Sequence, residues 1–177
     1  MNKLYLLFLP VLFACKLDVK GPGEKDEDNS SEKTSISQKT KTKIRNDIQL
    51  ETTGDVKVSQ AFLIYEDGKL VPADNKTEVG KPVNLRLIID DGWKEEGGDV
   101  SIGASERIET SDGQVMLDEK DLFKDFTTIS SSDARILSLS ASISRLDKLY
   151  DYFLVSFRVW DKNGPGEIKG NYRFYIQ

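Results

Sequence analysis

The chain has no histidine and a single cysteine, Cys15, among its 177 residues. Without histidine, nucleophilic sites of the Ser-His-Asp and Cys-His kinds, histidine pH switches and histidine-based zinc sites are all excluded. With one cysteine the chain cannot close an internal disulfide, so a folded part must be stabilised by its own core. The phosphate-binding pattern G-x-x-x-x-G-K-[ST] is also missing. These absences exclude more classes of enzyme than any motif suggests.

Long hydrophobic runs are scarce, and the longest is the uncharged segment Leu4–Ala14 between Lys3 and Cys15. A basic start, an apolar centre and small residues at the end predict a secretory signal peptide, here residues 1–14. An eleven-residue helix would reach about 17 Å, well short of a hydrocarbon core of about 30 Å. We therefore expect export and cleavage, with no membrane-spanning helix in this segment.

The residues Leu12-Phe13-Ala14-Cys15 resemble the lipobox of bacterial lipoproteins. The resemblance implies cleavage before Cys15, a diacylglycerol group on its thiol and an acyl chain on its new amine. It also implies a membrane partner, through the lipid, and a location in the bacterial cell envelope. The expected location is the outer membrane, with or without exposure at the cell surface. The alternative is an ordinary signal peptide in which the cysteine has no role.

Residues 15–53 have the composition of a disordered tether. They contain no aromatic residue, few aliphatic residues and many Ser, Thr, Lys and Glu, which cannot bury enough surface to offset ordering. Their charge is segregated, because Glu24–Glu32 holds five acids and one lysine, whereas Lys33–Arg45 holds five bases and no acid. The acidic block is either a sorting signal or part of a plain spacer. The basic block is either a solvated run or a contact for acidic lipid or polysaccharide.

The remainder, residues 54–177, alternates apolar and polar residues with the period of a half-buried β-strand. Turn signals such as Asp112-Gly113 separate the alternating runs. One short helix is expected over Glu119–Phe126, capped by Asp118. The expected strands lie at or near 56–66, 83–89, 100–102, 106–110, 114–117, 137–143, 153–159 and 168–176.

Seven to nine strands with little helix predict an all-β fold, an antiparallel β-sandwich. The stretch Tyr150–Asp161, the glycine-rich turn after it and Tyr172–Ile176 resemble the last hairpin of an immunoglobulin-like domain. The resemblance implies the sandwich architecture alone, since the cysteine pair of true immunoglobulin domains is missing. More loosely, the chain resembles sandwich domains of bacterial envelope lipoproteins. A β-barrel is the alternative fold.

Trp93 is the most suggestive candidate for binding, because it sits in a glycine-flanked loop among acidic residues. A tryptophan there could stack on a sugar ring or anchor a partner, while carboxylates accept hydrogen bonds from hydroxyl groups. In the alternative, Trp93 covers the edge of the core and the acids keep the loop soluble. The neighbouring candidates are Asp90, Asp91, Glu95 and Glu96.

The chain offers oxygen ligands, which calcium prefers, so calcium is the one metal to consider. Asp161 and Asn163 are weak candidates for binding it. We otherwise expect no metal, no cofactor besides the lipid on Cys15 and no catalytic residue. Nucleic acid is not an expected partner, since the net charge is −5. The sequence favours non-catalytic binding of an envelope protein or a polysaccharide. Alternatives are a structural subunit, with an apolar surface around Tyr150, Tyr152 and Leu154, and a glycoside hydrolase with two facing carboxylates.

Overall fold

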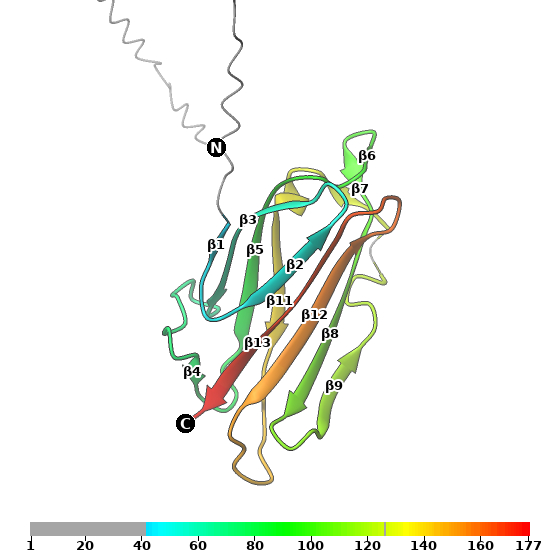
Figure 1. Ribbon diagram of the computed structural model, residues 1–177. Helices are drawn as coiled ribbons and strands as arrows, with labels where there is room; N and C mark the ends of the chain where they lie inside the picture. Colours follow the sequence, from blue (N-terminus) through cyan, green and yellow to red (C-terminus); the bar gives the residue numbers. More distant parts are fainter. Residues whose placement is uncertain (1–41, 126) are drawn as a thin grey trace, which may run out of the picture. The chain divides into compact units, whose positions relative to one another are not determined.

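The computed structural model describes residues 42–125 and 127–177, and these residues are almost entirely β-structure (Figure 1). Eight strands have five or more residues, in agreement with the seven to nine expected, and five more have two residues. A single 3-10 turn, η1 (Asp133–Arg135), completes the regular structure of this part. In chain order the strands are β1 (Lys43–Ile44), β2 (Gln49–Thr53), β3 (Lys57–Ile64), β4 (Lys76–Thr77), β5 (Val83–Asp91), β6 (Glu95–Glu96), β7 (Asp99–Val100), β8 (Ile102–Thr110), β9 (Val115–Glu119), β10 (Ile129–Ser130), β11 (Ile136–Ala141), β12 (Phe153–Asp161) and β13 (Glu167–Ile176).

Two sheets face each other and form a β-sandwich, as the sequence predicted. One sheet has the order β1-β3-β5-β11, and the other has the order β2-β13-β12-β8-β9 with β4 also paired to β13. The long pairs are antiparallel, whereas the short strands β1 and β4 pair in parallel with β3 and β13. A third, small sheet of β10, β7 and β6 lies in the loops.

The alternating runs form the core because every second side chain points between the two sheets. In β5, Val83, Leu85, Leu87 and Ile89 are buried, while Asn84, Arg86 and Ile88 face outward. From the opposite sheet, buried residues of β12 and β13 such as Phe153 and Phe174 stack at 5.4 Å between ring centroids. Each fully buried aliphatic or aromatic side chain stabilises the fold by about 1.5–3 kcal/mol.

The folded part begins earlier than the predicted boundary at residue 54, because β1 and β2 belong to the sandwich. β2 pairs with β13 over Glu167–Asn171, and Ile48 just before it is 3% exposed in the core. The side chains of β2 other than Leu50 are exposed and polar, so its composition is like that of a solvated segment. Its order comes from backbone pairing with a strand more than a hundred residues away, which composition does not report. The rest of the predicted tether, with Cys15 and the signal peptide, lies outside the described residues.

Two buried asparagines fix this early segment to the sandwich. The Asn46 amide donates to Asn75 Oδ1 at 2.8 Å, and the Asn75 amide donates to the Asn46 carbonyl and the Arg173 carbonyl, each at 2.8 Å. Asn46 Oδ1 also accepts from the Leu63 backbone N–H. Both asparagines have positive φ, 59° and 56°, which asparagine tolerates better than most residues.

The helix expected over Glu119–Phe126 is wrong. Asp118 and Glu119 instead complete β9, which pairs with β8, and turns follow them. Beyond β9, the Leu122 N–H donates to the Ala104 carbonyl, and Asp121 Oδ1 accepts from the Ala104 N–H. The chain thus keeps bonding to β8, and these contacts outweigh the local helical spacing of Leu122 with its neighbours.

Candidate functional site

Trp93, the candidate stacking residue, is half-buried and packs against the edge of the core. Its indole N–H donates to the Ala134 carbonyl at 3.3 Å, and its ring lies 3.5 Å from the Cβ position that a side chain would have at Gly166. Gly92 has a φ of 110°, and a Cβ there would lie 2.3 Å from the Asp55 carbonyl oxygen. This close approach folds the loop back on the sandwich, so the geometry matches the interpretation of Trp93 as a core cover.

The four acidic candidates near Trp93, at positions 90, 91, 95 and 96, are exposed. Three of them, Asp90, Asp91 and Glu95, join Trp93 around a hollow of about 70 Å³. Small-molecule sites are ordinarily several times larger, at roughly 300–1,000 Å³. A binding role for this loop therefore stays a prediction, and the structure offers a larger surface elsewhere.

The weak calcium candidates are drawn into a loop contact. Asp161 is 5% exposed, and its two carboxylate oxygens accept backbone N–H bonds from Lys94 at 2.6 Å and Asn163 at 2.8 Å. Among the described residues no group of three or more Asp, Glu, His or Cys side chains could hold a metal ion. Asp161 thus joins the loop after β12 to the Trp93 loop.

The apolar surface expected around Tyr150, Tyr152 and Leu154 is half-buried. Tyr150 packs edge-on against Phe153, with ring centroids 5.5 Å apart, and its hydroxyl contacts Gln114 and Asp147. The exposed apolar edge lies on β9 instead, where Val115, Met116 and Leu117 are 43%, 38% and 37% exposed. β9 pairs with β8 on one side, so it forms an edge of its sheet.

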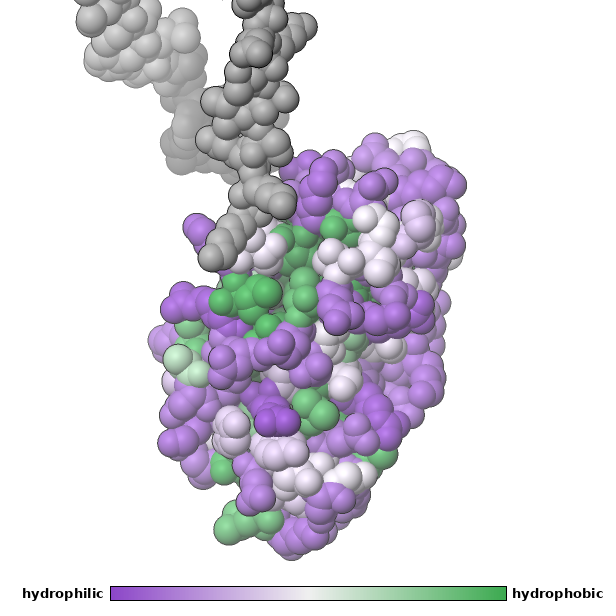
Figure 2. Space-filling model, viewed as in Figure 1, coloured by the Kyte–Doolittle hydropathy of each residue, from purple (hydrophilic) through white to green (hydrophobic). Residues whose placement is uncertain are grey.

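The outer face of the β2-β13-β12-β8-β9 sheet carries the best-formed site among the described residues. This face is turned to the viewer in Figure 2 and is largely hydrophilic. A hollow of about 460 Å³ crosses it, within the size range of small-molecule sites. We call it the sheet hollow. Its lining residues are Gln49, Leu50, Glu51, Ser105, Glu106, Arg107, Asp118, Glu119, Lys120, Ser156, Phe157, Arg158, Lys169, Gly170 and Asn171.

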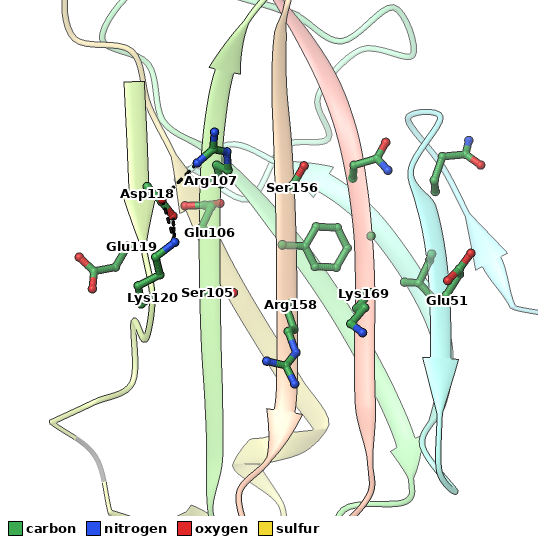
Figure 3. Close-up of a pocket in the computed structure, with 15 residues that line it drawn as sticks. Glu51, Ser105, Glu106, Arg107, Asp118, Glu119, Lys120, Ser156, Arg158 and Lys169 are labelled. Carbon is green, nitrogen blue, oxygen red and sulfur yellow. Dashed lines mark hydrogen bonds and ion pairs between the residues drawn. The ribbon is translucent and has the colours of Figure 1, made fainter. Parts of the chain in front are cut away.

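Strand register places the polar lining in two rows across the sheet (Figure 3). One row runs through Ser105, Arg158, Lys169 and Glu51, which are cross-strand partners in turn. The other row runs through Asp118, Arg107, Ser156, Asn171 and Gln49. Side chains two residues apart on a strand point to the same face of the sheet. Both rows therefore lie on one face and are held in place by the strands.

Small polar side chains in the middle of the two rows are available to a ligand. Ser105, Ser156 and Asn171 are each half-buried, and none forms a side-chain hydrogen bond with another described residue. Hydroxyl and amide groups can both donate and accept, which suits recognition of another polar molecule. The hollow thus offers hydrogen-bonding capacity that the fold leaves unused.

The four basic side chains that line the sheet hollow are all in ion pairs. Arg107 and Lys120 pair with Asp118 at 3.1 and 2.7 Å, as Figure 3 shows, and Arg158 and Lys169 pair with Glu167. The Lys120 ammonium is the main cause that lowers the pKa of Asp118, and the Lys169 ammonium lowers the pKa of Glu167. Arg107 also pairs with Glu109, and the carboxylates of Glu51 and Glu119 line the hollow as well, so the four cations are close to balanced by acidic side chains.

Glu106 lines the sheet hollow, but its side chain is on the core side of β8. It is 1% exposed, and its carboxylate oxygens have no hydrogen-bond partner among the described residues. Burial raises the pKa of Glu106 to about 7. The nearby Tyr172 hydroxyl is also buried without a partner.

A second hollow, of about 600 Å³, lies next to the first along β13. It lies where the edge of β13 passes from pairing with β2 to pairing with β4. We call it the edge hollow. Gln49 and Asn171 line both hollows. The other residues of the edge hollow are Asp47, Ala73, Asp74, Asn75, Lys76, Tyr172, Arg173 and Tyr175.

Sequence reasoning missed this face, although part of its signal was present. The alternation in β12 places Ser156 and Arg158 outward, which period two alone predicts. What alternation does not report is the register between strands, and register is what puts Asn171 of β13 beside Ser156. No single loop motif marks the site, because its residues come from β2, β8, β9, β12 and β13.

Comparisons with known proteins found similarity at the level of the fold. No protein-family model matches the chain, and no curated protein matches it. Among solved structures, the chain is similar to the crystal structure of the C-terminal domain of Wzt. The sequence identity is 15% and the TM-score is 0.49, over 78% of this chain and 83% of that one. The fold assignment rests on the strand registers of the chain itself.

Proposed function

We propose that this chain is a lipid-anchored protein of the bacterial cell envelope whose β-sandwich binds a neutral polysaccharide. The observation that supports the binding role is the sheet hollow, in which the side chains of Ser105, Ser156 and Asn171 form no hydrogen bond with another described residue. A sugar is rich in hydroxyl groups, which pair with hydroxyl and amide side chains of this kind. Strands hold these groups in fixed positions, so little ordering is needed on binding.

The charge of the hollow favours a neutral glycan over an anionic one. A polyanion needs unpaired cations, yet Arg107, Lys120, Arg158 and Lys169 are all paired. Binding of a neutral glycan should therefore change little with salt, because no counterions need to be released.

The proposed role is binding without catalysis. A glycoside hydrolase needs an acid that reaches the bond to be cleaved, together with a second carboxylate. Glu106 has the raised pKa of such an acid, but its oxygens have almost no contact with solvent. Asp118, the acid held by Arg107 and Lys120, has a lowered pKa.

The anchoring part of the proposal comes from the sequence around Cys15, outside the described residues. Acylation there would attach the chain to a membrane, for which we propose the outer membrane. Residues 16–41 would then connect the lipid to the sandwich. Among the described residues, no helix is long and apolar enough to cross a membrane.

A blocking substitution tests the binding role. Ser156→Tyr places a large side chain at the centre of the sheet hollow, and Ser138→Tyr is its matched control on the outer face of β11. We expect the wild-type chain and Ser138→Tyr to bind a neutral polysaccharide in a panel of glucans, mannans, galactans and polyuronates. Ser156→Tyr should bind that polysaccharide at least tenfold more weakly, with an unchanged melting temperature. Binding to none of the panel, or equal binding by Ser156→Tyr, contradicts the proposal.

A second candidate, assembly with another envelope protein, is favoured by the exposed apolar edge of β9. An unpaired strand edge can pair with a strand of another chain. Met116→Lys would add a charge in the middle of that edge. If β9 is the contact, this variant should lose a cross-linked complex that the wild-type chain forms on intact cells. It should keep its binding to glycan.

A further inference from the structure

We propose that the ligand is an extended glycan chain that runs along β13 from the sheet hollow to Tyr175, on whose ring a sugar unit stacks. This inference rests on the proposed function and adds to it a chain length, a direction and a binding residue. Its first support is that the two hollows share Gln49 and Asn171 and therefore adjoin along β13; we call the two together the groove.

The length of the groove follows from strand geometry. The outward side chains of β13 are Lys169 and Asn171 at the sheet hollow, then Asn171, Arg173 and Tyr175 at the edge hollow. From Lys169 to Tyr175 the strand rises about 20 Å, at roughly 3.4 Å per residue. A groove of that length accommodates several sugar units, whereas a monosaccharide would occupy a small part of it.

Tyr175 has the properties of a stacking platform. Its side chain is 36% exposed, it lines the edge hollow, and it makes no ring–ring or cation–ring contact with another described residue. Its backbone is fixed, since its N–H donates to the Asn75 carbonyl at 3.0 Å. A fixed and exposed aromatic ring offers an apolar face at small entropic cost.

The other large aromatics on this face are already covered. Trp160 lies so close to Gly103 that a Cβ there would approach its ring to 2.3 Å, and the Arg158 guanidinium is 4.9 Å from the ring centroid. The Tyr152 ring has the Arg173 guanidinium at 4.5 Å. Because these two rings are covered, we expect the glycan to run toward Tyr175.

The edge hollow also has little unbalanced charge, in agreement with a neutral chain. Lys76 pairs with Asp74 at 3.3 Å. Arg173 and Asp47, which have no ion pair among the described residues, have opposite signs. Both hollows therefore suit the same class of ligand.

The test is calorimetric titration of the full chain with oligosaccharides of increasing length, cut from the polysaccharide that binds best in the panel. We expect affinity to rise with length until the oligosaccharide reaches Tyr175, and then to level off. Tyr175→Ala should remove this gain, with about fivefold to tenfold weaker binding of long oligosaccharides and unchanged binding of short ones. Tyr175→Phe, which keeps the ring, should bind like the wild-type chain.

Two other outcomes would contradict either the extended path or the proposed function. If a disaccharide binds as tightly as a long oligosaccharide, or if Tyr175→Ala binds both like the wild-type chain, the extended path is wrong while the sheet hollow stands. If Ser156→Tyr also has no effect, the proposed function itself fails. Leu149→Ala is the control for surface truncation, because Leu149 is 87% exposed and lines neither hollow.

Discussion

At the scale of the residue, Glu106 is the most unusual group in the sandwich. It faces the core from the middle of β8, between the cross-strand neighbours Phe157 and Glu119. A buried carboxyl without a partner favours its neutral form, because burial penalises the charge. Burial accordingly raises the pKa of Glu106 from 4.5 to about 7.

Glu106 should make the stability of the fold depend on pH. A carboxyl whose pKa is raised on folding stabilises the fold fully below its unfolded pKa, and this contribution is lost as pH rises through the folded pKa. We therefore expect the free energy of unfolding to fall by about 3 kcal/mol between pH 4.5 and pH 8. Glu106→Gln, which cannot ionise, should remove most of this fall and be the more stable protein at pH 8.

Urea unfolding at pH 4.5, 5.5, 6.5 and 8 measures this effect. The chain has no histidine, so few other side chains titrate in this interval. Glu119→Gln, a half-buried neighbour on β9, is the control and should keep the pH dependence of the wild-type chain. Equal pH dependence in the wild-type chain and Glu106→Gln would show that the carboxyl is not held neutral by the fold.

Also at this scale, local sequence features drew attention to Trp93 and away from residues whose contacts are distant in sequence. Trp93 stood out because it sits in a glycine-flanked, acidic loop, and the sequence did not show that its indole N–H contacts the Ala134 carbonyl, 41 residues away. Asn46 and Asn75 did not stand out, although they join three segments of the fold. Contacts between residues far apart in sequence leave no local pattern.

At the scale of the element, alternation predicted the long strands well. The buried runs of β5, β11, β12 and β13 were all identified, because one face of each is apolar and the other polar. β1 and β2 were missed because they are short and mostly exposed. The helix over Glu119–Phe126 was wrong because bonds to β8 override local spacing.

The early strands should be needed for folding. A chain that begins at Gly54 loses β2, the buried Ile48 and the Asn46 side chain that bonds to Leu63 and Asn75. Loss of a buried isoleucine and of several buried hydrogen bonds costs at least 3 kcal/mol. We expect a melting temperature at least 10 °C below that of a chain beginning at Gln38, measured by circular dichroism.

A matched variant separates the asparagine contacts from the strand itself. Asn46→Ala keeps β2 but leaves the Leu63 N–H without its acceptor and Asn75 Oδ1 without its donor. It should lie between the two truncated chains in melting temperature. If the chain beginning at Gly54 has the same melting temperature as the chain beginning at Gln38, β2 is not needed for stability. The boundary predicted from sequence would then mark the start of the stable unit.

At the scale of the whole molecule, the fold and the site differ in how far sequence determines them. Composition and period two suffice for a β-sandwich, because a sandwich needs only strands with one apolar face. The groove arises from the register of β2, β8, β9, β12 and β13, which brings together residues as distant as Gln49 and Asn171. Alternation marks such residues as outward but does not say which of them meet.

The lipid on Cys15 should decide where the whole molecule resides without affecting the sandwich. Two acyl chains on the thiol and a third on the amine would hold a protein durably, whereas one chain gives only marginal binding. We expect the mature wild-type chain to begin at Cys15 by mass spectrometry, to carry the mass of the lipid and to enter the detergent phase. Cys15→Ala should enter the aqueous phase with the same melting temperature and glycan binding, because the described strands and the residues that line the groove all fall within residues 42–177. A wild-type chain that begins elsewhere, or that stays in the aqueous phase, would make the sandwich a secreted binding protein and remove the membrane from its function.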